Sequence, residues 1–240
     1  ESMPVATTPG SAPSAATIRT FSISPAVTRM FLESRDQAHV HILSAFPRFN
    51  SSTPRATVGL LWALGAKTST LTVQSIMKPS DPNLIGSLVR SRPLRLLSAG
   101  ESARFQLDIA CQKTPPSPVP EELRQQVKLS RAASQVQRPD LPHDHKSRGS
   151  YRSKKVTVPE AERKDWLLGR LERIGLSVAS EDLGTGSLQQ AAISPRRGRI
   201  PYIRARFEGT VVSAERFQAA QLDGVSSGKN YGLGMLLELS

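Results

Sequence analysis

The chain has 240 residues, enough for one large domain or two small ones, each with its own core. Its 32 Lys and Arg residues against 20 Asp and Glu give a formal net charge of +12, which favours a polyanionic partner. Nucleic acid is preferred over a membrane, because no long apolar span and no long basic amphipathic helix occurs. The single cysteine, Cys111, excludes an intrachain disulfide framework and is typical of a reducing compartment, so we expect a cytoplasmic protein.

Residues 1–16 are small and polar without an apolar core, and we expect a flexible tail rather than a signal peptide. Residues 17–113 then alternate strand-like and helix-like patterns. The expected elements are a strand at Ile18–Ser24, a helix at Phe31–Phe46, strands at Val58–Leu64 and Leu71–Ile76, a short helix at Asn83–Val89 and a last strand at Arg104–Cys111. The order βαββαβ is that of a ferredoxin-like unit.

Residues 114–150 are polar and rich in Pro, Gln, Arg and Ser, which predicts a linker or mobile loop with room for a short helix near Glu121–Val136. The pair His143 and His145 flanks Asp144 in this stretch. No cysteine or further histidine lies beside them, so the sequence predicts no metal site.

Residues 151–240 form a second segment. A helix begins at Pro159 and ends at Gly175, because proline suits a first helical turn and glycine a helix end. The next expected elements are a strand near Leu176–Ala179, an ambiguous loop, a long strand at Ile200–Val212, a helix at Ala214–Gln221, a Gly-rich turn and a final strand. This segment resembles a second, degenerate βαββαβ unit. We therefore predict an α+β fold of two tandem ferredoxin-like (RRM-like) domains with a cleft for an elongated ligand.

Two stretches are candidates for phosphate contact. On the long strand, Arg204 and Arg206 share one face with Tyr202, while the alternate residues are apolar. That face contacts either phosphate or only solvent. The basic stretch from Lys146 to Lys155 also contains Tyr151, and arginine, lysine and a stackable ring suit single-stranded or hairpin RNA.

The Gly-rich turn from Gly224 to Gly234 carries one lysine, Lys229, and such a turn exposes backbone N–H groups beside a cation. A nucleotide-binding P-loop is disfavoured, because three residues rather than four separate Gly224 from Gly228, and an apolar strand rather than a helix follows. A hairpin turn with a solvated lysine remains the alternative.

The first helix carries His39 and His41. At about 100° per residue, His39 falls near the edge of the apolar stripe and His41 well outside it. An edge position allows an imidazole to be half-buried and still reach a ligand, although a packed structural histidine is the alternative.

Together these residues resemble the CasE family of CRISPR RNA endoribonucleases. The residues that carry the resemblance are Ser34 to His39 with Phe46-Pro47, Leu60-Leu61-Trp62, Phe105-Gln106-Leu107 with Ala110 to Lys113, Lys154-Lys155-Val156, Trp166-Leu167, Arg206 to Gly209 and the closing Gly-Lys-x-Tyr-Gly-x-Gly-x-Leu. The closing signature is the most specific part. Residues 1–16 and the linker match nothing.

The resemblance implies a protein that cuts the repeat hairpin of CRISPR precursor RNA and keeps the product within Cascade. It implies a metal-independent reaction without a cofactor, in which a ribose 2′-OH attacks the adjacent phosphate to leave a 2′,3′-cyclic phosphate and a 5′-OH. The partners would be the repeat RNA and other Cascade subunits, with no membrane. A non-catalytic RNA-binding module of the same fold is the alternative.

The resemblance also implies site residues. The spacing to Phe46-Pro47 gives the general acid or base role to His39, and a gapped alignment would give it to His41. Several relatives carry a tyrosine and a basic residue where this chain has Asp36 and Val40, so the helper would differ, with Arg35 or a tyrosine of the second segment as candidates. The expected RNA-binding residues are Arg35, Arg152, Lys154, Lys155, Arg204, Arg206, Ser227, Gly228 and Lys229.

Overall fold

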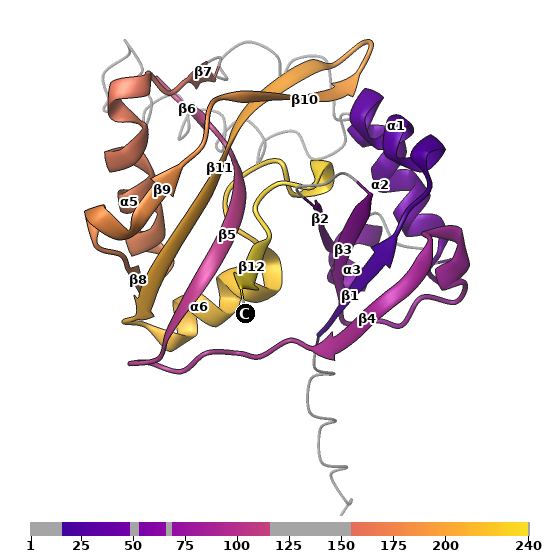
Figure 1. Cartoon of the computed structure of the whole chain (residues 1–240), viewed down its shortest axis with the longest axis horizontal. Helices are drawn as coiled ribbons and strands as arrows, with labels where there is room; N and C mark the ends of the chain where they lie inside the picture. Colours follow the sequence, from indigo (N-terminus) through magenta and orange to yellow (C-terminus); the bar gives the residue numbers. More distant parts are fainter. Residues whose placement is uncertain (1–15, 49–52, 66–68, 116–154, 240) are drawn as a thin grey trace, which may run out of the picture. The chain divides into compact units, whose positions relative to one another are not determined.

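The structure is a computed structural model that describes residues 16–48, 53–65, 69–115 and 155–239. It is a mixed α+β structure with antiparallel sheets (Figure 1). The chain divides into two compact units, one of residues 1–111 with 159–240 and one of residues 112–158. The two larger sheets both belong to the first unit.

The first sheet has the strand order β2-β3-β1-β4, and all its pairings are antiparallel. Its strands are β1 (Thr17–Ser22), β2 (Leu61–Leu64), β3 (Thr70–Ser75) and β4 (Ser87–Pro93). Helices α1 (Pro25–Glu33) and α2 (Arg35–Ser44) pack on one face through Phe31 and Ile42, which join Phe21, Trp62 and Val73 of the strands in one core. This core fixes the position of the helix that carries both histidines.

The predicted helix at Phe31–Phe46 is two helices that meet at Ser34. Ser34 has an extended backbone, and its hydroxyl accepts a hydrogen bond from the backbone N–H of Gln37 at 3.3 Å. The same hydroxyl donates to the carbonyl of Ile193 at 3.1 Å. Serine is a favoured N-cap residue, so α2 begins anew at Arg35 instead of continuing α1.

Two other predicted elements of this region are corrected. The predicted strand at Val58–Leu64 begins as the end of α3 (Pro54–Val58), and only its second half is β2. The predicted helix at Asn83–Val89 is wrong, because the short 3-10 helix η1 (Pro82–Leu84) is followed at once by β4. A strand at this place supplies the fourth member of the first sheet.

The second sheet has the order β10-β11-β5-β12. Its strands are β5 (Ser102–Ala110), β10 (Gln189–Ser194), β11 (Gly198–Val211) and β12 (Leu236–Leu239), with the short β8 (Leu176–Ser177) and β9 (Leu183–Thr185) also paired to β11. The predicted loop between Leu176 and Ile200 thus contains β9, β10 and the short 3-10 helix η4 (Ser180–Asp182). The connecting helices are η3 (Glu160–Glu162), α5 (Arg163–Arg173), α6 (Ala214–Asp223) and η5 (Lys229–Tyr231).

The strand predicted at Arg104–Cys111 does not close the first sheet. As β5 it pairs with β11 along nine residue pairs, from Tyr202↔Ala110 to Thr210↔Ser102, and on its other side with β12. Its apolar face behaves as expected, since Phe105 packs against the rings of Phe207 and Phe217. Alternation identifies the two faces of a strand but not its neighbours, so β5 was assigned to the wrong sheet.

Buried amides connect the two sheets. Gln221 of α6 accepts a hydrogen bond from the N–H of Leu97 at 3.2 Å and donates to the carbonyl of Arg95 at 3.0 Å. Gln74 of β3 donates to the carbonyl of Gln221 at 2.7 Å. These hydrogen bonds hold α6 between the segment after β4 and the first sheet.

In the second unit, β6 (Gln112–Lys113) pairs with β7 (Val156–Thr157). Residues 1–15 of the predicted tail and most of the predicted linker, including the helix near Glu121–Val136, lie outside the described residues, whereas Ala16, the last residue of that predicted tail, is buried. Among the described helices, none has the length and apolarity needed to cross a membrane.

Gln221→Met tests the buried amide. The methionine fills a similar volume but leaves the Leu97 N–H and the Arg95 carbonyl without their partner, so we expect the free energy of unfolding to fall by about 2 kcal/mol. Chemical denaturation measures it. Gln218→Met is the matched control, because it removes one hydrogen bond, to the carbonyl of Leu97, and should cost about half as much. Equal losses for the two variants would contradict the prediction.

Candidate active site

His39 and His41 point to different surroundings on α2. His41 lies edge-on to the ring of Phe31, with centroids 5.9 Å apart, and its Nε2 is buried without a hydrogen-bond partner. It lines a pocket of about 470 Å³ with Met30, Gln37 and other residues of α1 and α2. His39 is also half-buried, but the charges that act on it are those of Arg55 and Asp36. The two rings therefore occupy different sites.

The environment of His39 favours its neutral form. Burial lowers the pKa of His39, the positive charge of Arg55 lowers it further, and the carboxylate of Asp36 raises it in part. Its Nδ1 is buried without a hydrogen-bond partner. A ligand would therefore exchange a proton with His39 through Nε2. A neutral imidazole at neutral pH is able to act as a general base.

Arg55, which acts electrostatically on His39, meets Lys229 at the carboxylate of Asp223. Arg55 lies on α3, and its guanidinium contacts Asp223 Oδ1 at 3.5 Å while donating a hydrogen bond to the carbonyl of Leu60 at 3.3 Å. The ammonium of Lys229 contacts Asp223 Oδ2 at 2.7 Å. Lys229 belongs to η5, which packs against α2. Lys229, predicted as a phosphate ligand, is thus paired with an acid of its own chain.

A second set of polar groups lies around Asp36 of α2. Arg197, in the turn between β10 and β11, contacts Asp36 Oδ1 at 3.7 Å. The same nitrogen of Arg197 donates a hydrogen bond to the hydroxyl of Tyr231 at 3.2 Å. Tyr231 lies two residues after Lys229, so η5 contributes a cation and a phenol to the surroundings of α2.

The Gly-rich turn holds η5 by close packing that only glycine allows. Gly232 has φ 69°, and a Cβ there would lie 2.5 Å from the ring of Trp62. Gly234 has φ 84°, and its N–H donates to the carbonyl of Asp108 at 2.6 Å. Ser227 is exposed and Gly228, at φ 91°, precedes η5. The loop is therefore a folded element rather than an open hairpin turn.

The other predicted RNA-binding residues are divided between the surface and the interior. Arg35 is only 5 % exposed, with its guanidinium 5.3 Å from the centre of the Trp62 ring and its Nε without a partner, so it does not offer the predicted surface contact. Burial lowers the pKa of Arg35, partly offset by Tyr202 and Asp108. The helper role that the sequence allows for Arg35 is disfavoured for the same reason.

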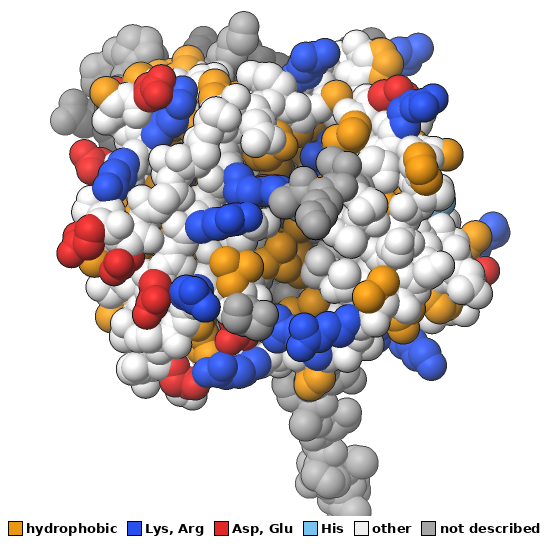
Figure 2. All heavy atoms as spheres, viewed as in Figure 1, with side chains coloured by type: hydrophobic (Ala, Val, Ile, Leu, Met, Phe, Trp, Pro, Cys, Tyr) orange, Lys and Arg blue, Asp and Glu red, His pale blue; other side chains and the backbone are white. Residues whose placement is uncertain are grey.

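Arg204 and Arg206 also differ. Arg204 makes two hydrogen bonds to the carboxylate of Asp108, at 2.7 and 2.8 Å, and one to the carbonyl of Leu64 at 3.2 Å. Arg206 is exposed and contacts Gln106 at 3.2 Å. Figure 2 shows Lys and Arg side chains gathered on the face over β5 and β11. Of the predicted pair, Arg206 alone is on the surface, because Asp108 and Leu64 hold Arg204.

The remaining predictions fall elsewhere. Arg152 and Lys154 lie outside the described residues, as do His143 and His145, whereas Lys155 is exposed in the second unit. Within the described ranges, no group of three or more His, Cys, Asp or Glu residues could hold a metal ion.

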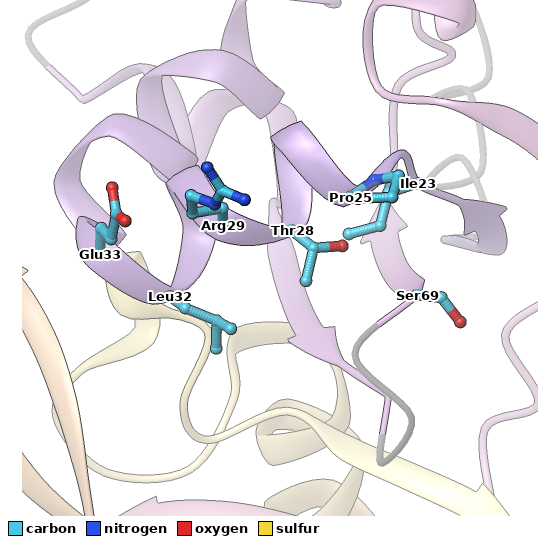
Figure 3. Close-up of a pocket in the computed structure, with 7 residues that line it drawn as sticks. All are labelled: Ile23, Pro25, Thr28, Arg29, Leu32, Glu33 and Ser69. Carbon is cyan, nitrogen blue, oxygen red and sulfur yellow. The ribbon is translucent and has the colours of Figure 1, made fainter.

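A further pocket lies along α1. It has a volume of about 490 Å³ and follows α1, between Leu32 and Ser69 (Figure 3). None of the predicted site residues lines it. Its lining combines Ile23, Pro25 and Leu32 with Thr28, Arg29, Glu33 and Ser69, and includes no histidine, so we do not assign it to the candidate site.

Sequence comparison adds the family. The model of a family described as CRISPR associated protein matches residues 16–237. The chain belongs to this CRISPR-associated family. A comparison with curated protein sequences gives no match.

Solved structures of CRISPR endoribonucleases share the fold. A Cse3 endoribonuclease bound to a 19-nucleotide RNA is 20 % identical, with a TM-score of 0.69 over 95 % of this chain and 100 % of the other. Thermus thermophilus Cse3, bound to an RNA that represents a pre-cleavage complex, is 20 % identical, with a TM-score of 0.67 over 94 % of this chain and 100 % of the other. The CRISPR-associated protein Cas6e from Escherichia coli K-12 is 18 % identical, with a TM-score of 0.59 over 92 % of this chain and 98 % of the other. At these identities the likeness concerns the fold.

Several site residues were not found from sequence. Arg55, Arg197 and Asp223 lie in no motif. Tertiary contacts bring Arg197 to Asp36 of α2, Arg55 within electrostatic reach of His39, and Asp223 to Arg55 and Lys229. Tyr231 had a signal, because it is the tyrosine of the closing Gly-Lys-x-Tyr-Gly signature.

Arg55→Gln tests the electrostatic coupling at His39. Removing the positive charge should raise the pKa of His39, because the imidazolium no longer faces a cation. Histidine NMR titration measures the pKa, with His39→Gln to assign the resonance. Arg48→Gln removes an equal charge from an exposed position and should leave that pKa in place. A His39 pKa that falls in Arg55→Gln would contradict the coupling.

Proposed function

We propose that the protein is an endoribonuclease that cuts the repeat hairpin of CRISPR precursor RNA and keeps the product within Cascade. The observation that carries this proposal is the site itself: a half-buried His39 beside Arg55, on a helix packed against the loop of Lys229 and Tyr231. Membership of the CRISPR-associated family supports the substrate. The RNA named with the Cse3 structures of the same fold supports it further.

The proposed fold is that of two tandem ferredoxin-like domains. It is supported by the strand orders β4-β1-β3-β2 and β12-β5-β11-β10, each with its first strand in the middle beside its last. In this proposal β5 opens the second domain, and η1 stands where the first domain would carry its second helix.

The proposed reaction is a transesterification that needs two proton transfers. Neutral His39 takes the proton of the ribose 2′-OH as the 2′-oxygen bonds to phosphorus. The bond from phosphorus to the 5′-oxygen breaks, and that oxygen takes a proton from a general acid. The products are a 2′,3′-cyclic phosphate and a 5′-OH. His39 then releases the proton that it took, and the general acid regains the one that it gave, both by exchange with water.

Tyr231 is our candidate for the general acid. The guanidinium of Arg197 donates to the phenolic oxygen at 3.2 Å and would stabilise the phenolate that forms when the proton leaves. Asp36 pairs with Arg197, the partner of Tyr231, and also raises the pKa of His39 in part. One carboxylate therefore interacts with the surroundings of both the proposed base and the proposed acid. Tyr231 thus fits the tyrosine helper from the second segment.

His39→Ala and His41→Ala test the proposed base. With a repeat hairpin and EDTA present, we expect His39→Ala to cut about 10² to 10⁴ times more slowly, because proton transfer contributes about this factor. His41→Ala should cut at close to the native rate. The reverse result would move the role to His41, and native rates for both variants would exclude both histidines. No cleavage by the native protein would favour the non-catalytic RNA-binding module.

Tyr231→Phe tests the proposed acid while keeping the ring. We expect roughly a 10²-fold loss of cleavage rate on normal RNA. A substrate with sulfur in place of the 5′-oxygen leaving group should restore most of that rate, because a thiolate leaves without a proton. His39→Ala should remain slow on the same substrate. A Tyr231→Phe defect that sulfur does not relieve would exclude Tyr231 as the acid.

A further inference from the structure

The ion-pair group of Arg55, Asp223 and Lys229 is arranged as an occupied anion site. Arg55 comes from α3 and Lys229 from η5, and they contact different oxygens of one carboxylate, at 3.5 and 2.7 Å. Two cations that share the two oxygens of one anion would bind the non-bridging oxygens of a phosphate in the same manner.

The exposed fractions of the three side chains show which of them faces the solvent. The side chains of Arg55 and Lys229 are each 20 % exposed, whereas that of Asp223 is 69 % exposed. The carboxylate therefore lies on the solvent side of the cations, where an incoming phosphate would arrive. Asp223 is the last residue of α6, and Gly224 follows it at φ 79°. A side chain at a helix end with such exposure is able to turn away without disturbing the core.

Charge gives the carboxylate a role in the free protein. Arg55 and Lys229 would repel each other if no anion lay between them, and Asp223 neutralises one of the two charges. Partial burial raises the pKa of Asp223, but hydrogen bonds and charge from Lys229 and Arg55 lower it by more, so the acid stays ionised. One net positive charge remains to attract a phosphate.

The site is next to the proposed base. Arg55 acts electrostatically on His39, and η5, which carries Lys229, packs against the helix of His39. A phosphate bound between Arg55 and Lys229 would thus lie beside His39. Arg55 keeps its hydrogen bond to the carbonyl of Leu60 and remains fixed when Asp223 leaves.

We propose that Arg55 and Lys229 form a phosphate-binding site that Asp223 occupies as an internal counter-ion until a phosphate of the RNA backbone displaces it. The identity of the phosphate rests on the proposed function. The exchange of one anion for another keeps the cations paired in both states. It also weakens binding of phosphate, because each bound phosphate must compete with a carboxylate of the same chain.

Asp223→Asn is the decisive variant, because it removes the competitor and keeps the size of the side chain. We expect inorganic phosphate to bind Asp223→Asn about three to ten times more tightly than it binds the native protein, a modest factor because exposed ion pairs cost little to break. The NMR shifts of Arg55, Lys229 and His39 on addition of phosphate measure this affinity. A repeat hairpin with hydrogen in place of the attacking 2′-OH should gain by a similar factor. Glu215→Gln removes an equal charge at the other end of α6 and should change neither affinity.

Loss of a cation should have the opposite effect. Lys229→Gln and Arg55→Gln should each abolish the phosphate-induced shifts, with circular dichroism to check that both variants fold. Phosphate or RNA affinity in Asp223→Asn that is unchanged or weaker would overturn the proposal. So would phosphate shifts that persist without either cation.

These outcomes separate the site from the proposed function. If His39-dependent cleavage is present but Asp223→Asn behaves as Glu215→Gln does, the phosphate site fails and the endoribonuclease stands. If phosphate binds more tightly to Asp223→Asn while no hairpin is cut, the phosphate site stands and the endoribonuclease fails.

Discussion

The packing around Trp62 is the contact on which the candidate site depends. Trp62 is 1 % exposed, and three elements meet its ring: Phe31 of α1 edge-on at 5.6 Å, Arg35 of α2 at 5.3 Å, and Gly232 at the end of η5. Because Gly232 has no Cβ, the loop is able to approach the ring closely. The helix of His39 and the loop of Lys229 and Tyr231 are thus packed on one indole, although almost 200 residues separate them.

Buried arginines explain why so few of the predicted basic residues are available to a ligand. Arg35 lies over the ring of Trp62 with its Nε buried and without a partner, and Arg204 is held by Asp108 and by the carbonyl of Leu64. Arg35 therefore packs α2 on the first sheet, and Arg204 joins the second sheet to the first. The positive charge of the chain is consequently a poor guide to which arginine binds RNA, since composition counts buried and exposed cations alike.

The faces of β11 and the bounds of the helical region at 159–175 were well predicted from sequence, whereas the neighbours of the strands within the sheets were not. The alternation in Ile200–Val212 gave the two faces of β11, and the Pro and Gly residues bounding 159–175 gave η3 and α5. The sheet of β5 was wrong because a strand pattern contains no information about neighbours, and the break at Ser34 was missed because apolar spacing continues across it. For the site, helical geometry predicted His39 near the edge of the apolar stripe and His41 well outside it. The structure instead has both histidines half-buried, with His41 packed on Phe31. Arg55, Arg197 and Asp223 lay beyond reach, because only the tertiary fold brings them to α2.

The two acids of the site have different consequences for the chemistry. Asp36 raises the pKa of His39 and holds Arg197, so it opposes the neutral imidazole while supporting the phenol of Tyr231. Asp223 partly neutralises Arg55, whose charge lowers the pKa of His39. A phosphate that replaced Asp223 would bring comparable or greater negative charge close to the imidazole. The exchange would therefore leave the pKa of His39 unchanged or raise it, so the neutral base depends on burial and on the charge of Arg55 rather than on the departure of Asp223.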